Sequence, residues 1–260
     1  MEDKLVESMR QKMSETYNRS IFLYNDRIGS VSFIDSMGTD LTIVNSARVS
    51  FGREKDELDQ RDKRLIKYLV KHKHTSTFEH NVVTFKFVVP LFVRSQHHRH
   101  RTWSYNEISR RYTDKNMQFY LPEVFRTQHK SNRQASNPEN LINPKVHGED
   151  SILAKSSMTM ADLLRVRTRD CVGTYNDMIE RGVCREQARM VLPQNLYTEY
   201  YGTCNLSNLL KFIDLRTHEG AQWEIQKVAE ACLEIASDLW PVAVESYRDI
   251  KYAGISESTT

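Results

Sequence analysis

Alternation of apolar and polar residues marks the strands of this chain. Residues 81–90 (NVVTFKFVVP) alternate and are rich in β-branched and aromatic side chains, which predicts a strand that ends at Pro90. Residues 196–205 (LYTEYYGTCN) are strand-like in the same way. Residues 28–52 carry a turn signal at MGTD and apolar residues at strand spacing, so we expect one or two strands that end near Ser46.

Helical spacing of apolar residues predicts the other elements. Residues 57–74 place Leu65 and Leu69 four positions apart, with Asp56 or Asp59 available as the N-cap. A helix is expected to start after Pro90. Further helices are predicted over residues 151–181 (stopping at Gly182), 184–193, 206–217 and 219–240.

Strands in the first half and helices in the second half favour an α/β fold of the α+β type, with a mixed central sheet flanked by helices. A length of 260 residues allows one large domain or two small ones. Residues 1–20 read as a polar N-terminal arm and residues 246–260 as a C-terminal tail. Residues 127–150 are rich in Asn and poor in apolar side chains, which predicts a surface loop or insertion.

Composition narrows the functional classes. The net charge of +3 is nearly balanced, so the basic character is local and favours a defined anion site over a general polyanion binder. No apolar run is long enough to span a bilayer, and the first residues lack the apolar stretch of a secretory signal. The cysteines are Cys171, Cys184, Cys204 and Cys232, and they form no CxxC motif. This spacing is typical of free thiols in a cytoplasmic protein.

The local basic character is concentrated in QHHRHRTWSYNEISRRY, residues 96–112. Its cations repel one another unless water or an anion faces them, and arginine forks match phosphate oxygens. Asn106 offers a donor and an acceptor that suit the edge of a pyrimidine or flavin ring, Glu107 can accept from a ribose hydroxyl, and Ser109 can donate to a phosphate. The set therefore favours a nucleotide site, against the plainer interpretation of a highly charged surface helix.

Residues 99–112, RHRTWSYNEISRRY, resemble the signature of the flavin-dependent thymidylate synthase family, R-H-R-x-x-S-x-N-E-x-S-x-R-Y. All of its fixed positions match: Arg99, His100, Arg101, Ser104, Asn106, Glu107, Ser109, Arg111 and Tyr112. Similar family segments are ARVSFG (47–52), HTSTFEH (74–80), ARMVLP (188–193), LR (215–216) and AQWEI (221–225). The resemblance thus covers most of residues 40–230.

This resemblance implies a single catalytic domain, which we place at residues 21–245, and a specific reaction. Enzymes of the family convert dUMP to dTMP with methylenetetrahydrofolate as the carbon donor. They bind FAD, which is reduced by NADPH and supplies the hydride. They are homotetramers whose active sites are built between subunits, so we expect small-molecule substrates and neither a nucleic-acid nor a membrane partner.

The resemblance also assigns residues, position by position. The positions that match dUMP contacts are Gln96, Arg99, Glu107, Ser109, Arg111, Arg189 and Arg216. The positions that match FAD contacts are His74, Ser76, Glu79, Arg99, His100, Arg101, Asn106, Glu107 and Asn205. Ser207 stands where the family commonly has arginine and Lys211 where it has histidine or asparagine, so Lys211 is expected to restore charge near the FAD phosphates.

The expected catalytic residue is Arg216, by the same resemblance. The classical thymidylate synthase needs a cysteine thiolate, which requires a basic neighbourhood, yet no cysteine lies in the basic segment. Cys184, near Arg181 and Arg185, is the thiol to check. Otherwise an arginine must stabilise the charge on the ionised uracil ring. Ser109 has no neighbouring general base in the sequence and is assigned to binding.

Two other functions fit parts of the pattern. Arginine and histidine interleaved with Trp103, Tyr105 and Tyr112 are typical of a nucleic-acid-binding module, which would be colourless and salt-sensitive. A zinc protein could use His72, His74, His80, His97, His98 or His100. No helix-spaced pair comes with an acid and a third ligand, so no metal site is expected.

Overall fold

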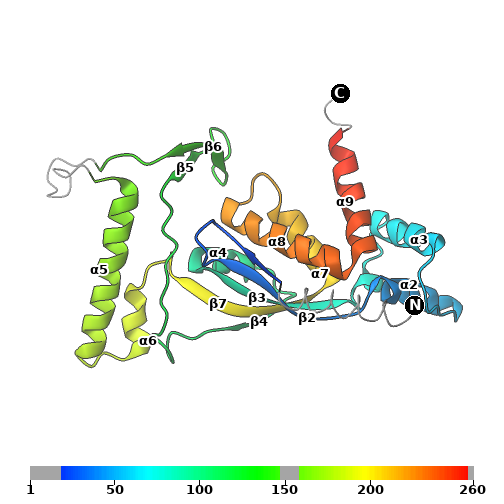
Figure 1. Ribbon diagram of the computed structural model, residues 1–260, viewed down its shortest axis with the longest axis horizontal. Helices are drawn as coiled ribbons and strands as arrows, with labels where there is room; N and C mark the ends of the chain where they lie inside the picture. The colour runs from blue at the N-terminus through cyan, green and yellow to red at the C-terminus, as the bar shows by residue number, and fades with distance from the viewer. Residues whose placement is uncertain (1–18, 147–157, 257–260) are drawn as a thin grey trace, which may run out of the picture.

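A five-stranded antiparallel sheet forms the centre of the computed structural model, which describes residues 19–146 and 158–256. The strand order is β1-β2-β3-β7-β4 (Figure 1). The strands are β1 (Ser20–Phe22), β2 (Ser30–Met37), β3 (Val82–Pro90), β7 (Tyr197–Asn205) and β4 (Ser104–Glu107). The expected α+β fold with helices flanking a central sheet is confirmed. The sheet was expected to be mixed, but every strand pair in it is antiparallel.

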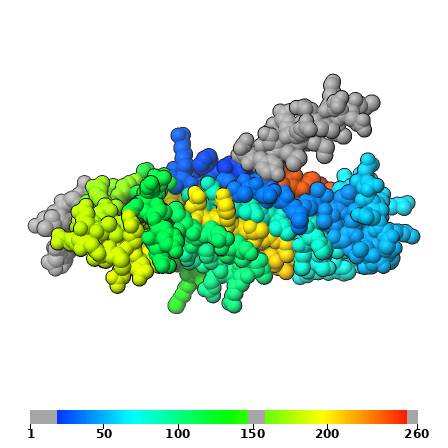
Figure 2. Space-filling view, turned by 90° about the horizontal axis from the view of Figure 1, so that it is seen from below, coloured from blue at the N-terminus to red at the C-terminus, as the bar shows by residue number. Residues whose placement is uncertain are grey.

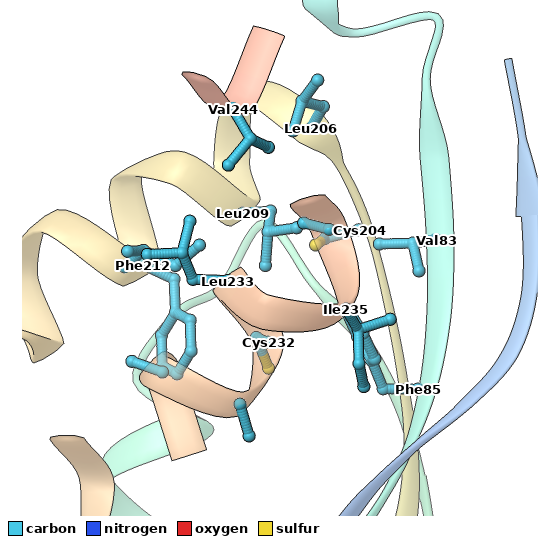
Figure 3. Close-up of a cluster of buried hydrophobic side chains, with 14 of the residues drawn as sticks. Val83, Phe85, Cys204, Leu206, Leu209, Phe212, Cys232, Leu233, Ile235 and Val244 are labelled. Carbon is cyan, nitrogen blue, oxygen red and sulfur yellow. The ribbon is translucent and has the colours of Figure 1, made fainter. Parts of the chain in front are cut away.

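Helices α4 (Leu91–His97), α7 (Leu206–Arg216) and α8 (Trp223–Leu239) lie on one side of the sheet (Figure 1). Alternation along β3 points Val83 and Phe85 toward them. Figure 3 shows these side chains meeting those of the covering helices: Leu209, Phe212, Cys232, Leu233 and Ile235. This one-sided burial forms the hydrophobic core.

The opposite face of the sheet carries polar and exposed side chains. Lys86 of β3 and Glu199 of β7 form an ion pair there at 3.5 Å, and Tyr201 is half exposed. Figure 2 shows β7 (yellow) open to the surface on this side. One buried face and one open face explain why the strands alternate in sequence.

A group of helices packs at one end of the sheet: α2 (Asp40–Arg48), α3 (Gln60–Lys71), α9 (Pro241–Ser256) and the short 3₁₀ helices η1 (Val49–Phe51) and η2 (Thr75–Phe78). Asp59 is the N-cap of α3, as predicted, and accepts from two backbone N–H groups. Lys67 of α3 binds Asp249 of α9 at 2.6 Å. Helix α9 runs through the boundary expected after residue 245, so residues 246–256 belong to the folded unit rather than to a tail. The expected arm lies almost wholly outside the described residues.

At the other end lie α5 (Met160–Glu180), α6 (Arg185–Ala188) and η4 (Arg189–Val191) (Figure 1). Thr159 caps the start of α5, and Gly182, with φ of +85°, follows its end as expected. The predicted start near residue 151 lies outside the described residues. Within the described residues, no helix combines the length and apolar character needed to cross a bilayer.

Residues 127–150 were expected to form a surface loop or insertion, and the part of it that the structure describes, residues 127–146, contains regular structure. Strands β5 (Phe125–Gln128) and β6 (Ser136–Ile142) pair there as a two-stranded sheet. The hairpin is stabilised by Arg126, which bonds Ser136 within it and Glu224 on α8. Composition could not reveal this, because the decisive partner lies far away in the sequence.

The expectation of strand up to Ser46 is also wrong beyond Met37, because Asp40–Arg48 is helix α2. Gly38 adopts φ of +84° and turns the chain. Thr42 Oγ1 then accepts from Thr39 N (3.0 Å), which caps the new helix. Helical spacing brings the β-branched Ile43 and Val44 into the core, so tertiary packing outweighs their strand preference.

Replacing Asp40 tests the junction between α2 and α9. Asp40 is 4% exposed and accepts from the backbone N–H groups of Val242 and Ala243, both at 2.9 Å. We expect Asp40→Asn, which loses one acceptor, to lower the free energy of unfolding by about 1–3 kcal/mol in a urea titration. The control Asp35→Asn affects an exposed carboxylate on β2 and should change it by less than about 0.5 kcal/mol. Equal losses in both variants would refute the role of Asp40.

Candidate active site

Two local geometries turn the side chains of residues 91–112 in different directions. Pro90 ends β3 and α4 follows at once, with Arg94 and Gln96 two positions apart and therefore on different sides of the helix. In β4, Asn106 and Glu107 point to opposite faces of the sheet because strand side chains alternate. The signature is thus not a single surface helix, and the edge strand β4 was not predicted.

A cleft of about 800 Å³ lies on the Arg94 and Glu107 side, and we call it the Glu107 cleft. Arg94 donates to Glu107 from both Nε and Nη2, with the shortest contact from Nη2 to Oε2 at 2.6 Å, and Thr198 Oγ1 donates to Oε1 at 2.6 Å. Of the residues assigned to dUMP, Glu107, Ser109 and Arg189 line this cleft. Arg111 does not line it, but its Nε lies 3.9 Å from Glu186, which does.

A second group, the Arg216 cluster, comprises Gln96, His100 and Arg216. Arg216 ends α7, where its Nε donates to His100 Nε2 at 3.1 Å and its Nη2 donates to the Gln96 carbonyl oxygen at 3.2 Å. The Gln96 side chain donates to Gln222 Oε1. None of these residues lines the Glu107 cleft, so within one chain the assigned dUMP residues form two separate groups.

Three of the arginines assigned to dUMP lack anionic partners, whereas Arg94 is paired with Glu107. Arg99, Arg189 and Arg216 form no ion pair with any residue of the described ranges. Partial burial, together with the charge of Arg99, lowers the pKa of Arg216. Partial burial and then the Arg216 charge lower the pKa of His100 to about 4, so that His100 is neutral and accepts from Arg216. An anionic ligand would relieve this repulsion.

The residues assigned to FAD are spread more widely. His74 lines a cavity of about 440 Å³ between α3, α7 and α9, here called the lysine cavity, which is lined by Lys71, Lys73, Lys211 and Lys251. Ser76 and Glu79 are exposed at η2 nearby, and Asn205 caps α7 by accepting from Asn208 N at 2.9 Å. The exposed Arg101 and Asn106 line neither space, so one chain does not gather the whole set.

The two departures from the family pattern meet in the lysine cavity. Ser207 and Lys211 lie one helical turn apart on α7 and both line it. Ser207 is buried, with 4% of its surface exposed, and its hydroxyl has no hydrogen-bond partner within the described residues. Four lysines line the same cavity and Asp214 pairs with only one of them, Lys251, so the lining with its unpartnered hydroxyl suits a polar anionic ligand.

Some residues of these spaces were missed by sequence reasoning. Arg94 lies in the same helix as Gln96, but nothing in the local pattern distinguishes it from a solvated arginine. Tyr247 and Lys251 line the lysine cavity from α9, in the segment expected to be a tail. A helical pattern over residues 241–256 was the available signal for these two.

No cysteine lines the Glu107 cleft. Burial raises the pKa of the Cys204 and Cys232 thiols, which lie in the core. Cys184 is exposed, with Sγ 3.7 Å from Gln187 Oε1. Within the described residues, no group of three or more His, Cys, Asp or Glu side chains is arranged to hold a metal ion.

Comparisons with known proteins assign the family. The model of the Thy1 family, described as thymidylate synthase complementing protein, matches residues 32–242. The chain belongs to the Thy1 family. It is 42% identical to the flavin-dependent thymidylate synthase of Thermus thermophilus, over 89% of this chain and 80% of that protein. It is 40% identical to that of Thermotoga neapolitana, over 86% of this chain and 92% of that protein.

Solved structures agree with this assignment to the Thy1 family. The crystal structure of the UMP/dUMP methylase PolB from Streptomyces cacaoi, bound with 5-Br dUMP, has a TM-score of 0.71 to this chain. The two are 32% identical, and the match covers 88% of this chain and 97% of PolB. The fold expected from the family resemblance is therefore confirmed.

The His100–Arg216 contact predicts a pH dependence. The pKa of His100 is lowered to about 4 in the folded chain, whereas histidine in an unfolded chain titrates near ~6.5. The unfolded chain therefore binds a proton more readily, and the free energy of unfolding falls as the pH drops from ~6.5 to ~4. We expect the His100 ring to titrate near 4 by NMR. The free energy of unfolding of the wild type, measured relative to that of His100→Gln, should fall as the pH drops from ~6.5 to ~4. The Gln side chain keeps an acceptor for Arg216 but does not titrate. A midpoint at or above ~6.5 would contradict this.

Proposed function

We propose that this chain is a flavin-dependent thymidylate synthase that methylates dUMP to dTMP in the cytoplasm. The observation that carries the proposal is the Glu107 cleft with its unpaired Arg189, in a chain 32% identical to a methylase whose solved structure holds 5-Br dUMP. The cleft has the size of a small-ligand site. Ser109 and Arg189 bind the phosphate of dUMP, and Arg111 lies at its edge.

The two groups of residues form one site by contribution from two copies of the chain. The Glu107 cleft of one copy supplies the phosphate contacts, while Gln96, Arg99 and Arg216 of another copy face the uracil. The separation of the two groups within a single chain supports this arrangement, because Gln96, Arg99 and Arg216 do not line the Glu107 cleft of their own copy. Assembly into a homotetramer provides the shared sites.

The residues present fit an FAD. The lysine cavity offers ammonium groups for a diphosphate and the unpartnered Ser207 hydroxyl for a further contact. Lys211 supplies there the charge that the family commonly places at position 207. His74, Ser76, Glu79 and Asn205 lie beside this cavity, whereas His100, Arg101, Asn106 and Glu107 do not line it and reach the flavin from other copies of the chain.

The chemistry follows from this arrangement. When bound, FAD supplies a hydride that comes from NADPH, and methylenetetrahydrofolate supplies the carbon. Arg216 stabilises the negative charge that develops on the uracil ring, which makes the neighbouring carbon nucleophilic. His100 and the Gln96 carbonyl hold the guanidinium in place. Cys204 and Cys232 stay protonated in the core, and neither Cys171 nor Cys184 lines the Glu107 cleft, so the proposed activation uses no thiolate.

The Arg216→Ala variant tests the catalytic assignment. The purified wild type should be yellow, lose its visible absorbance on reduction with NADPH, and form dTMP from dUMP and methylenetetrahydrofolate. Arg216→Ala should keep the FAD spectrum and lower kcat about 100-fold, because charge stabilisation is lost. Arg167→Ala, an exposed arginine paired with Asp170 on α5, is the matched control and should keep wild-type turnover. A colourless wild type that binds no dUMP would refute the function itself.

Hybrid assemblies test the shared site. Arg216→Ala and Arg189→Ala chains, each with a different affinity tag, are co-expressed and purified through both tags. If each site takes Arg216 from one copy and Arg189 from another, about half of the sites in a one-to-one hybrid pair are intact. We expect dTMP formation well above that of either parent variant. Hybrids no more active than the parents would place both arginines in the same copy's site.

A further inference from the structure

A buried hydrogen-bond network at the start of α8 connects the β5–β6 hairpin to Gln96. Glu224, at 3% exposure, accepts from Arg126 Nη2 at 2.5 Å, from the Tyr120 hydroxyl at 3.3 Å and from Gln222 Nε2 at 2.9 Å. Gln222 Oε1 in turn accepts from Gln96 Nε2. The chain of contacts therefore runs from Arg126 through Glu224 and Gln222 to the Arg216 cluster.

The Glu224 carboxylate determines the direction of every bond in this chain. Facing a guanidinium, it has oxygens that accept and no hydrogen to donate. Burial, and then the charge of Glu224, raises the pKa of Tyr120, which stays a donor. Gln222 must turn its NH₂ group toward Glu224 and its carbonyl oxygen toward Gln96. Gln96 must then donate to Gln222, which leaves its own Oε1 for another partner.

The position of Gln222 supports a role beyond the fold. Gln222 is the N-cap of α8, yet its side chain makes no capping hydrogen bond. Helix N-caps are usually residues whose short side chains accept from the first turn. Here the longer amide instead joins Glu224 to Gln96, a connection that helix formation does not need.

Arg126 also has contacts with the hairpin and with Trp223. Its Nε donates to Ser136 Oγ of β6 at 3.0 Å, and its guanidinium lies 4.9 Å from the ring centroid of Trp223. The hairpin lies on the same side of the sheet as α8 (Figure 1). Its two strands thereby fix the guanidinium that faces Glu224.

We propose that Arg126, Glu224 and Gln222 are positioning residues that orient the Gln96 amide, so that Gln96 offers dUMP a hydrogen-bond acceptor. The inference rests on the proposed function, in which Gln96 contacts the nucleotide. The Oε1 atom of Gln96 receives an O–H or N–H group of the nucleotide. The hairpin inserted at residues 125–142 therefore acts on the active site without touching the substrate.

A double-mutant cycle tests the relay in the full chain saturated with FAD, with the dUMP dissociation constant measured by calorimetry. Gln222→Met frees the Gln96 amide to rotate and should weaken dUMP binding roughly fivefold, the loss expected for one hydrogen bond. Gln96→Met should weaken it by a similar factor. The double variant should bind no more weakly than Gln96→Met, because Gln222 acts through Gln96.

Glu224→Gln tests the direction of the bonds. A neutral amide can both donate and accept, so it no longer dictates how Gln222 is turned. This variant should weaken dUMP binding in the wild-type background and have no effect in the Gln96→Met background. Gln222→Asn, whose amide is too short to reach both partners, gives the same test if Gln222→Met does not fold.

Gln226→Met is the matched control. Gln226 lies on the same helix and donates to the backbone oxygens of His218 and Ala221, so the same substitution there should leave dUMP affinity unchanged. Unchanged affinity in Gln222→Met, or losses that add in the double variant, would overturn the relay while leaving the proposed function intact. A wild type that binds FAD but no dUMP would overturn both.

Discussion

The antiparallel pairing of β3 with β7 is the constraint on which the site depends. The register runs from Val82 opposite Asn205 to Pro90 opposite Tyr197. Helix α4 starts where β3 ends, α7 starts where β7 ends, and β4 pairs with the free edge of β7. A slip of one residue would turn each strand's side chains to the other face. This single register therefore sets where α4, β4 and α7 present their polar residues.

The candidate site contains arginines whose positive charge is not neutralised by a described carboxylate. Arg99, Arg189 and Arg216 face no described carboxylate, whereas Arg94 is fully engaged with Glu107. Repulsion between Arg99 and Arg216 raises the energy of the ligand-free protein and is relieved by an anion. The buried cysteines, with raised thiol pKa values, take no part in this arrangement. In the proposed reaction, attraction between unpaired arginines and negative charge thus serves both substrate binding and activation of the uracil ring.

Segments outside the signature complete the site. The β5–β6 hairpin contributes Arg126 to the network under α8, and α9 contributes Lys251 to the lysine cavity. Lys251 also lies 3.1 Å from Asp214 of α7 and 2.8 Å from Thr217. Both segments looked like appendages in the sequence. The hairpin instead contacts α8, and α9 contacts α7. Both segments therefore pack against helices that carry candidate site residues.

The sequence by itself determined the elements whose signals are local: α3 with its Asp59 cap, the alternating β3 and β7, and the signature from Arg99 to Tyr112. Tertiary structure decided the rest. Helix α2 replaced the expected strand because burial of Ile43 and Val44 outweighs local preference. Arg126 meets Glu224 across 98 positions of the chain, and Gln96 meets Gln222 across 126. Composition and spacing report on neighbours along the chain, whereas these contacts exist only once the sheet has brought distant segments together.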